Sequence, residues 1–323
     1  MPELRKDYLL DRYVIIATER SQRPTDSIPK RDKPSAKTKC PFCPENEKML
    51  LGVKEEIKGS DGNWLVRAVP NKYAAVSLEG EPKIQTHNKF FTFASAYGMH
   101  EVIIDTPDHN TEFEDLPQEH IEKVLEMYIR RIKALDGQPN IKYVALFKNR
   151  GVIAGASISH AHSQIIAYNA LPTKVEEELK AFYDYFIKNE ACPFCEIINI
   201  EKGSYRRCFE DEHFVAFTPY ASRFAFEIWI FPKRHIGNII QLDEAEIKSL
   251  ACMLRKVLNR LDNLDYPPYN MQVHNAETGE AFHFHIEITP RLATWAGFEI
   301  ATETVINPTS PEEAAKFYRG ETQ

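Results

Sequence analysis

The chain has 323 residues and a formal net charge of -7, with 43% hydrophobic and 27% charged residues. It is longer than one hydrophobic core usually extends, so two domains or a duplicated unit are expected, and it lacks the excess of Lys and Arg that general nucleic-acid binding requires. No run approaches the roughly 18 apolar residues of a membrane helix, and the charged start differs from a signal peptide. We therefore expect a cytoplasmic protein without a membrane or nucleic-acid partner.

The same order of features appears twice, starting from two Cys-Pro-Phe-Cys motifs at residues 40–43 and 192–195. After each motif come a strand, a second strand that ends on a histidine, a helix with apolar residues at helical spacing, and a third strand. The predicted ranges are 64–69, 101–109, 116–135 and 143–147 in the first repeat and 214–218, 227–235, 242–264 and 269–273 in the second. Repeats of this length indicate a duplicated domain.

Each repeat closes on a strand in which polar and apolar residues alternate: His160-Ala-His162-Ser-Gln164 in the first and His283-Phe-His285-Ile-Glu287 in the second. Residues 173–188, between the repeats, predict a charged amphipathic helix. Strands, helix and strands in this order predict an α+β fold with a mainly antiparallel sheet and flanking helices. We expect two domains, at residues 1–172 and 173–323.

Cysteines and histidines occupy equivalent places in the two repeats. Structural zinc commonly takes four Cys and His ligands in tetrahedral array, with a close Cys pair and the others from elsewhere. The predicted ligands are Cys40, Cys43, His109 and His160 in the first repeat and Cys192, Cys195, His235 and His283 in the second. One template that supplies four ligands twice favours zinc over a redox dithiol, because neither pair lies at the strand-to-helix turn of a βαβ unit.

A second set of ligands remains open for the C-terminal repeat. Glu178, His274, His283 and His285 could hold zinc or iron without the cysteines. The remaining histidines lie in polar segments and are predicted to be ordinary surface residues; they are His87, His100, His120 and His213.

His162 is the candidate nucleophile. The period of two along a strand puts it on the same face as His160, and a neutral imidazole is a competent nucleophile toward phosphorus. Gln164, next on that face, donates hydrogen bonds to phosphate oxygens but neither protonates a leaving group nor activates water, which favours group transfer over hydrolysis. Glu287 takes the place of Gln164 in the second repeat, where a carboxylate would repel a phosphoryl group. We therefore assign the chemistry to the first repeat.

The stretch from Asn149 to Ser157 lies just before these histidines. It supplies an amide, a guanidinium, a hydroxyl and the glycines Gly151 and Gly155. This composition suits a loop wrapped around a diphosphate.

These residues resemble the histidine-triad superfamily, and within it the duplicated galactose-1-phosphate uridylyltransferase family. The family's His-Pro-His-Gly-Gln signature appears as His160-Ala-His162-Ser-Gln164, and its Cys-Pro-Phe-Cys-Pro-Gly-Asn-Glu appears as Cys40-Pro-Phe-Cys-Pro-Glu-Asn-Glu47. The resemblance covers nearly the whole chain and implies a duplicated histidine-triad-like fold. It also implies exchange of UMP between UDP-glucose and galactose 1-phosphate, in two steps, through a uridylyl-histidine at His162.

The resemblance further implies which residues form the site. Zinc is expected on the four ligands of the first repeat, and His162, Gln164, His160 and Ser157 form the catalytic group. Phosphate and nucleotide contacts are expected from Arg20, Arg23, Asn71, Asn149, Gly155, Ser157 and Gln164. Members of the family are homodimers in which a C-terminal hexose-binding segment completes the partner's site, and here Phe298 and Glu299 fall in that segment.

Several positions depart from the family pattern. Ala161 and Ser163 replace Pro and Gly, residues 293–299 lack the family's Lys-Phe pair, and Val305 stands where Gln is usual. The second Cys pair and the C-terminal tail are instead similar to a plant relative, ADP-glucose phosphorylase. Transfer of AMP by the same histidine is therefore the alternative to transfer of UMP. A zinc-stabilised nucleotide-binding protein without turnover would require His162 to be inert.

Overall fold

The computed structural model describes residues 1–22, 37–276 and 282–322, and these form two compact units. Unit N comprises residues 37–148 and 158–173, and unit C comprises residues 1–22, 149–157 and 174–322. The segment 149–157 belongs to unit C because Arg150 donates hydrogen bonds to Asp262 Oδ1 (2.6 Å) and to the carbonyl oxygen of Pro267 (2.8 Å).

Unit N is built on an antiparallel sheet of order β3-β4-β7-β9-β8. Its strands are β3 (Glu55–Lys58), β4 (Trp64–Pro70), β7 (Gly98–Ile104), β8 (Tyr143–Arg150) and β9 (His162–Tyr168). The helix α1 (Gln118–Leu135) packs across β3, β4, β7 and β9 and buries an apolar stripe that includes Ile121, Val124 and Tyr128. Tyr128 of α1 meets Ser163 of β9, so the alternate residues His162 and Gln164 face the opposite side of the sheet.

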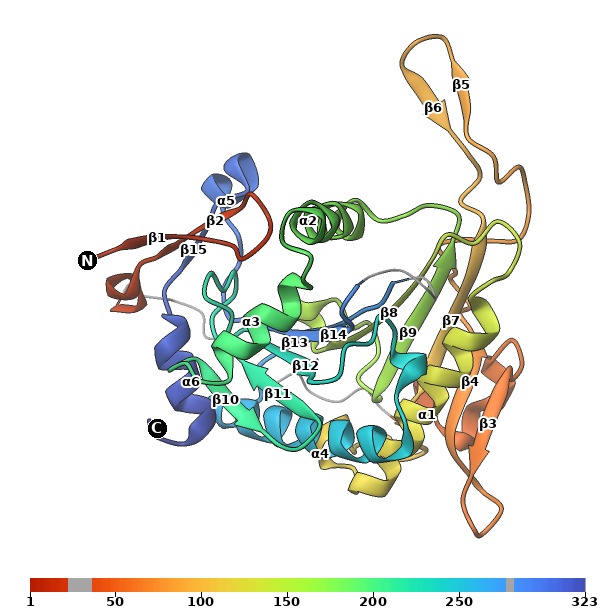
Figure 1. Cartoon of the computed structure of the whole chain (residues 1–323). Helices are drawn as coiled ribbons and strands as arrows, with labels where there is room; N and C mark the ends of the chain where they lie inside the picture. Colours follow the sequence, from red (N-terminus) through yellow and green to blue (C-terminus); the bar gives the residue numbers. More distant parts are fainter. Residues whose placement is uncertain (23–36, 277–281, 323) are drawn as a thin grey trace. The chain divides into compact units, whose positions relative to one another are not determined.

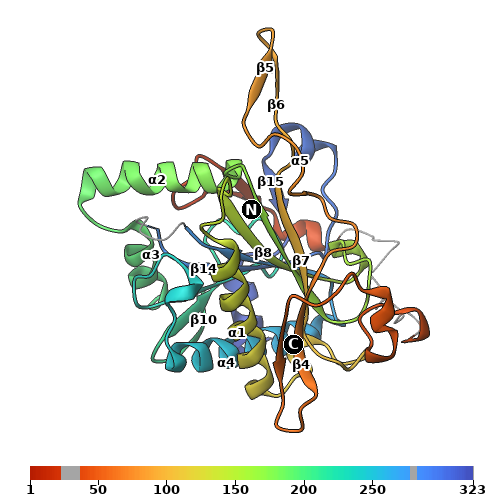
Figure 2. The ribbon, with the colours of Figure 1, turned by 90° about the vertical axis from the view of Figure 1, so that its right-hand side faces the viewer.

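A hairpin of β5 (Gln85–His87) and β6 (Phe91–Phe93) projects away from the rest of unit N (Figures 1 and 2). Its tip exposes Phe90 (84%) and Phe91 (68%) to solvent. Exposed apolar patches of this kind mark interaction surfaces more often than isolated apolar residues do.

Unit C repeats the strand order of unit N. Its sheet runs β10-β11-β12-β14-β13, again with antiparallel neighbours. Its strands are β10 (Arg207–Glu210), β11 (Phe214–Phe217), β12 (Ile228–Pro232), β13 (Tyr269–His274) and β14 (His285–Pro290). The predicted duplication and the α+β class with mainly antiparallel sheets are thereby confirmed. No helix in the described ranges is long and apolar enough to cross a membrane.

Helices cover both faces of the unit C sheet. Val215, Phe217 and Phe231 pack against aromatic residues of α2 (Thr173–Asn189) and α3 (Pro193–Glu201). The alternate residues of β11 and β12 are also buried, and α4 (Glu244–Leu261) packs against β11. Such double coverage explains why these two strands are apolar at every position rather than at every second one.

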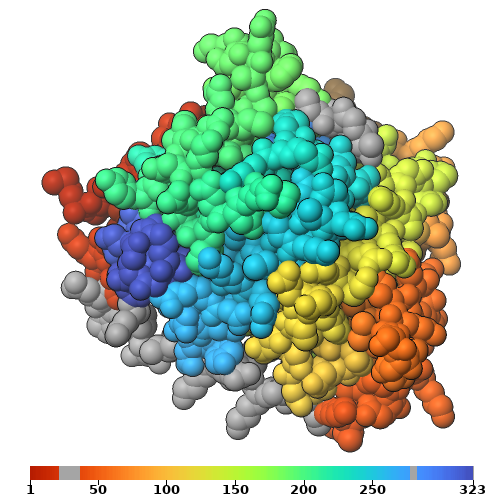
Figure 3. Space-filling model, turned by 60° about the horizontal axis from the view of Figure 1, so that its bottom comes forward, coloured from red at the N-terminus to blue at the C-terminus, as the bar shows by residue number. Residues whose placement is uncertain are grey.

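The two ends of the described chain meet in unit C. A small sheet joins β1 (Glu3–Lys6), β2 (Tyr13–Ile16) and β15 (Val305–Asn307), with β15 parallel to β2. The short helix α5 (Gly297–Thr302) precedes β15, and α6 (Pro311–Arg319) follows it. Figure 3 shows α6, in dark blue, on the surface beside α4, in light blue.

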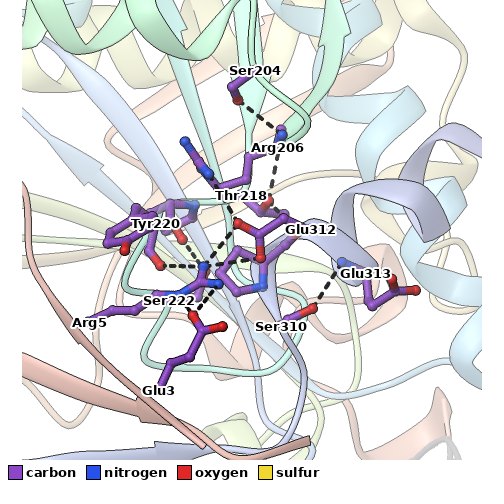
Figure 4. A network of polar contacts seen from close by, with 12 residues as sticks. Glu3, Arg5, Ser204, Arg206, Thr218, Tyr220, Ser222, Ser310, Glu312 and Glu313 are labelled. Carbon is purple, nitrogen blue, oxygen red and sulfur yellow. Dashed lines mark hydrogen bonds and ion pairs between the residues drawn. The ribbon is translucent and has the colours of Figure 1, made fainter. Parts of the chain in front are cut away.

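A polar network holds these ends together (Figure 4). Both oxygens of Glu312 on α6 accept from Arg5 Nη1 at 3.0 Å, and Oε1 also accepts from Arg206 Nη1 at 3.0 Å. The two guanidinium groups lie over the ring of Tyr220, at 4.6 and 5.2 Å from its centroid. Arg206 also donates to Glu201, whose side chain is fully buried. Burial of the Glu201 carboxylate is tolerable only because charge and hydrogen bonds are supplied together.

We expect the Arg206→Met variant to lose about 3 kcal/mol of unfolding free energy, because it leaves the Glu201 carboxylate buried with only part of its compensation. Urea denaturation followed by circular dichroism measures this loss. Arg207→Met is the matched control, since Arg207 is exposed and pairs only with Glu210 among acidic side chains of the described residues. Equal loss in the two variants would contradict the importance of this network.

Candidate active site and metal-binding clusters

The four ligands predicted in the first repeat come together in unit N. Their sulfur and ring nitrogen atoms all lie within 4.8 Å of one another, and all four side chains are buried. Cys43 Sγ lies 3.3 Å from His109 Nδ1, and Cys40 Sγ lies 3.5 Å from His160 Nδ1. These separations suit soft ligands that share one tetrahedral ion.

The hydrogen bond of His160 shows which nitrogen can serve as a ligand. His160 Nε2 is 2.7 Å from the carbonyl oxygen of Thr106. A carbonyl oxygen only accepts, so Nε2 carries the proton and the lone pair of Nδ1 is directed at the two thiols. A ring fixed in this way by a carbonyl on its far side is the usual arrangement of a metal-ligating histidine.

His162 is held in the opposite tautomer. Its Nδ1 donates to the carbonyl oxygen of His160 at 2.8 Å, so Nε2 has the free lone pair. The ring packs against Phe42, with centroids 5.2 Å apart, and the residue is only 6% exposed. Burial, which disfavours the imidazolium ion, lowers the pKa of His162 to about 4. The ring is therefore neutral and unprotonated at Nε2 near pH 7.

A buried ion pair that the sequence did not reveal supports the start of β9. Lys148 Nζ donates to Asp105 Oδ2 at 2.6 Å and to the carbonyl oxygen of His162 at 3.1 Å. Asp105 Oδ1 accepts from Ser163 Oγ at 3.5 Å, and Ser163 Oγ lies 2.5 Å from the hydroxyl of Tyr128 on α1. Ser163, which stands where the family has glycine, thus has a side chain that contacts Tyr128 and Asp105.

Gln164 is oriented by a histidine that was predicted to lie on the surface. His100 Nε2 lies 2.9 Å from Gln164 Oε1 and 3.1 Å from Asn71 Nδ2. The surface prediction for His100 was wrong, because β7 pairs with β9 and places His100 across from Ile166. Since Oε1 is the atom that faces these partners, the amide nitrogen of Gln164 remains available as a donor.

The predicted phosphate loop belongs to unit C. Asn149 Oδ1 accepts from Asn270 Nδ2 at 2.8 Å, and the same nitrogen donates to the carbonyl oxygen of Ala154 at 2.7 Å. Gly155 has a φ of 92°, a conformation that favours glycine. Ser157 is exposed. The loop is therefore shaped by its own backbone and by Asn270.

Four predicted substrate residues remain. Three of them, Arg20, Phe298 and Glu299, lie in unit C. Arg20 is half-buried in the 3-10 helix of residues 18–22, and Arg23 lies outside the described residues. Phe298 on α5 is 46% exposed. Glu299 is buried, and its Oε2 accepts from the backbone nitrogen of Ala296 at 2.9 Å, which caps the first turn of α5.

Unit C contains the second Cys and His cluster. Ligand atoms of Cys192, Cys195, His235 and His283 lie within 4.8 Å of one another. His283 Nε2 bonds the carbonyl oxygen of Pro232 at 2.9 Å, so its Nδ1 faces Cys195 Sγ at 3.5 Å. The geometry of His160 is thus repeated here, although Cys195 and His235 are less buried than their counterparts.

The alternative metal set is divided between two places. His283 lies with the cysteines, whereas His274, His285 and Glu287 form a third group of ligand atoms, and Glu178 Oε2 lies 3.1 Å from His274 Nδ1. The charges of Glu287 and Glu178 outweigh burial and raise the pKa of His274 to about 9. Glu287 also accepts from Lys174 at 2.7 Å, so this carboxylate is engaged in ion pairs.

Comparisons with known proteins find similarity over nearly the whole chain. The family model described as galactose-1-phosphate uridyl transferase, N-terminal domain, matches residues 1–172, and that of the C-terminal domain matches residues 178–315. ADP-glucose phosphorylase of Arabidopsis thaliana is 34% identical, over 98% of this chain and 92% of its own. Galactose-1-phosphate uridylyltransferase of Thermotoga maritima is 33% identical, over 99% of this chain and 98% of its own. A crystal structure of the Arabidopsis phosphorylase with bound ADP-glucose matches all of both chains, with 32% identity and a TM-score of 0.86.

We expect Lys148→Met to lower the unfolding free energy by about 3–5 kcal/mol, because it leaves the Asp105 carboxylate buried without the positive charge that now faces it. Chemical denaturation measures this effect. Lys142→Met, which changes an exposed lysine just before β8, should have little effect. If Lys148→Met leaves the free energy of unfolding unchanged, other groups compensate the charge of Asp105.

Proposed function

From the premise that the chain belongs to the galactose-1-phosphate uridylyltransferase family, we propose that it transfers a nucleoside monophosphate between sugar phosphates through a covalent intermediate on His162. The preferred reaction is exchange of UMP between UDP-glucose and galactose 1-phosphate. The observation that carries this proposal is the tautomer of His162, whose Nδ1 proton is given to the carbonyl oxygen of His160. A buried neutral ring with a free Nε2 lone pair is the nucleophile that this chemistry needs.

The proposed reaction has two displacements at the α-phosphorus. Nε2 of His162 attacks, a phosphorus–nitrogen bond forms, and the bond to the sugar phosphate breaks; the sugar phosphate leaves as an anion and needs no proton. A second sugar phosphate then attacks the same phosphorus, which restores the neutral ring. The positive charge on the modified imidazole is relieved by its Nδ1–H bond to the His160 carbonyl.

Gln164 is proposed to steady the transferred phosphoryl group. Its Oε1 faces His100 and Asn71, so its amide nitrogen is the atom left to donate to a phosphate oxygen. An amide supplies this bond without delivering a proton to water, which keeps hydrolysis from competing with transfer. His100 is proposed as a positioning residue for Gln164.

Transfer of AMP is the second candidate. The Arabidopsis relative is an ADP-glucose phosphorylase, and the second Cys pair, which resembles that relative, is assembled with His235 and His283 in unit C. The acceptor would then be inorganic phosphate instead of a hexose phosphate. Donor and acceptor preference distinguishes the two reactions.

Zinc is the proposed occupant of both Cys and His clusters. In His160 and His283 the Nε2 proton is donated to a carbonyl oxygen, so Nδ1 is unprotonated and faces the thiols. Nδ1 of each ring can therefore bind a metal ion without first losing a proton. Zinc held there would be structural: it would tie the turn after Cys40 to β9 and keep His160 in place. The alternative set of Glu178, His274, His283 and His285 is not proposed as one site, because His283 lies with the cysteines, whereas the group of His274, His285 and Glu287 is a further candidate for iron or zinc.

A homodimer is the proposed active form. Phe298 is exposed on α5, and the hairpin of β5 and β6 exposes aromatic side chains on unit N. Both surfaces would be covered if the hexose segment of one subunit completed the site of its partner.

Labelled donor incubated without acceptor should leave label on His162 through an acid-labile, base-stable phosphoramidate, and kinetics should be ping-pong. Offering UDP-glucose and ADP-glucose separately, with galactose 1-phosphate or phosphate as acceptor, identifies the base and the acceptor.

His162→Gly should abolish labelling. Gln164→Ala should still be labelled, about 10²- to 10³-fold more slowly. Full labelling of His162→Gly, or sequential kinetics in the wild type, would refute the covalent mechanism.

Metal analysis after native purification should find about two zinc ions per chain, one for each Cys and His cluster. Cys40→Ser and Cys192→Ser form a matched pair, and each should lose one ion. Only Cys40→Ser should strongly slow the labelling of His162, because its cluster contains His160. Wild-type protein without zinc, or equal slowing in both variants, would contradict this assignment.

Glu299→Gln should raise the KM for the hexose phosphate more than it changes nucleotide binding, because a carboxylate accepts more strongly from sugar hydroxyls. Glutamine keeps the reach needed to cap α5, so the helix should stay intact. Sedimentation should show a dimer for both wild type and variant. A fully active monomer would overturn the proposal of a shared site.

A further inference from the structure

The backbone around His162 is fixed at three consecutive carbonyl oxygens. The carbonyl oxygen of His160 accepts from His162 Nδ1 at 2.8 Å, which is a bond within the motif itself. The carbonyl oxygen of Ala161 accepts from the backbone nitrogen of Asp105 at 3.1 Å, and that of His162 accepts from Lys148 Nζ at 3.1 Å. Asp105 and Lys148 are joined by an ion pair of 2.6 Å. Both bonds from outside the motif therefore come from one buried pair.

His162 is the first residue of β9, and the pairing of this strand explains why a side chain bonds its carbonyl oxygen. On β7, Ile104 lies opposite His162. The register between β8 and β9 ends where Lys148 lies opposite Ser163, one residue short of His162. From that last paired position the Lys148 side chain reaches the carbonyl oxygen of His162. The lysine thus extends the contact between β8 and β9 to the residue that carries the proposed nucleophile.

The residues after β7 that support this arrangement are themselves fixed. The carbonyl oxygen of Asp105 accepts from His120 Nε2 on α1 at 2.8 Å, and the carbonyl oxygen of Thr106 accepts from His160 Nε2 at 2.7 Å. Asp105 is fully buried. Its backbone nitrogen, carbonyl oxygen and carboxylate all have partners, so this residue can serve as a rigid support for the segment 160–162.

A buried ion pair contributes little to stability by itself. Replacement of such a pair by apolar residues of similar volume is often neutral or stabilising, because the two charges no longer have to be desolvated. Loss of one partner alone is costly, since the other charge stays buried. Leucine and methionine in place of Asp105 and Lys148 would therefore fill the same space, but they would donate nothing to the His162 carbonyl oxygen. This difference separates a role in folding from a role in positioning.

We propose that Asp105 and Lys148 are positioning residues that hold the ring of His162 in line with the α-phosphorus of the donor. The inference rests on the proposed covalent function of His162. Lys148 acts through the His162 carbonyl oxygen, and Asp105 acts through Lys148 and the Ala161 carbonyl oxygen, so neither needs to contact the reacting atoms. Attack requires those atoms to be about 3–3.5 Å apart and aligned, and a displacement of roughly 1 Å can slow a reaction about a hundredfold.

The double variant Asp105→Leu, Lys148→Met tests this role in the full-length protein. Single-turnover labelling is measured with labelled UDP-glucose and, separately, with labelled ADP-glucose. At saturating donor the rate constant should fall roughly ten- to hundredfold, whereas the donor concentration for half-maximal rate should stay near the wild-type value, because the donor contacts are kept. The unfolding free energy and the metal content should also stay near the wild-type values. An unchanged rate constant in the folded variant overturns the proposal.

A second buried pair on β7 provides the matched control. Arg131 donates to both oxygens of Glu101, at 2.8 and 2.9 Å. Glu101 is buried and lies opposite Ile165 of β9. The double variant Glu101→Leu, Arg131→Met makes the same apolar exchange in the same unit, away from the carbonyl oxygens of residues 160–162. It should be labelled at the wild-type rate, and equal slowing in the two double variants would overturn a specific role for Asp105 and Lys148.

The tautomer of His162 provides a readout that does not depend on turnover. Nitrogen–proton correlation spectra of protein with isotope-labelled histidine, assigned with His162→Gly, should show a single Nδ1–H tautomer in the wild type. The Asp105→Leu, Lys148→Met variant should show a mixture, because the bond from Nδ1 to the His160 carbonyl oxygen depends on the backbone that the pair holds. A variant that keeps the single tautomer contradicts positioning through the backbone.

The two readouts distinguish this inference from the proposed function. Absence of labelling in the wild type rejects the proposed function, while the spectra still decide whether the pair fixes the ring of His162. Wild-type labelling with an unchanged rate in the double variant rejects the positioning role alone. If the apolar pair does not fold, Lys148→Met replaces it, because the amplitude of labelling counts the folded molecules and the rate constant reports on their site.

Discussion

The assignment of protons on the two histidines of each repeat decides what the rest of each site can do. His160 gives its Nε2 proton to the carbonyl oxygen of Thr106, and His162 gives its Nδ1 proton to the carbonyl oxygen of His160. The rings of His160 and His162 are thus fixed in opposite tautomers, because a backbone carbonyl oxygen accepts a hydrogen bond but cannot donate one. The lone pair of His160 Nδ1 is directed at a pair of thiols, whereas the lone pair of His162 is on Nε2. The lone pairs that stay free thus lie on different ring nitrogens, Nδ1 of His160 and Nε2 of His162.

Unit C keeps this arrangement of protons but changes its surroundings. His283 and His285 make the same two carbonyl hydrogen bonds, to Pro232 and to His283. The residue after them on the strand face is Glu287, and its carboxylate lies 3.2 Å from His274 Nε2. An anionic phosphoryl group approaching His285 would meet this carboxylate, whereas in unit N it would meet the amide of Gln164. Equivalent backbone positions therefore present an uncharged amide in unit N and an ion-paired carboxylate in unit C.

The sequence predicted what depends on local periodicity and on repetition. Both long helices were found, and their ends shifted only where a cap intervened: α1 begins at Gln118, directly after Pro117, and α4 ends at Leu261 before a short 3-10 turn. Both Cys and His clusters were assembled correctly as groups, because two copies of one template constrain each other. Segment 149–157 could not be placed in unit C from the sequence, since its partners Asp262 and Asn270 lie more than a hundred residues away.

Pairing across strands was the information that the sequence lacked, and its absence led to the error on His100. A histidine in a polar stretch is typical of a surface, yet the register of β7 against β9 brings its ring to Gln164. Lys148 and Asp105 show the same limit, since neither residue lies in a recognisable motif although the two are among the most deeply buried charged residues in the described ranges. Their ion pair places a positive charge beside the His162 carbonyl, and that charge works with burial to disfavour protonation of the ring. Burial is the main cause of the lowered pKa of His162, and Lys148 on β8 adds to it, so the environment of this ring depends on β8 as well as on β9.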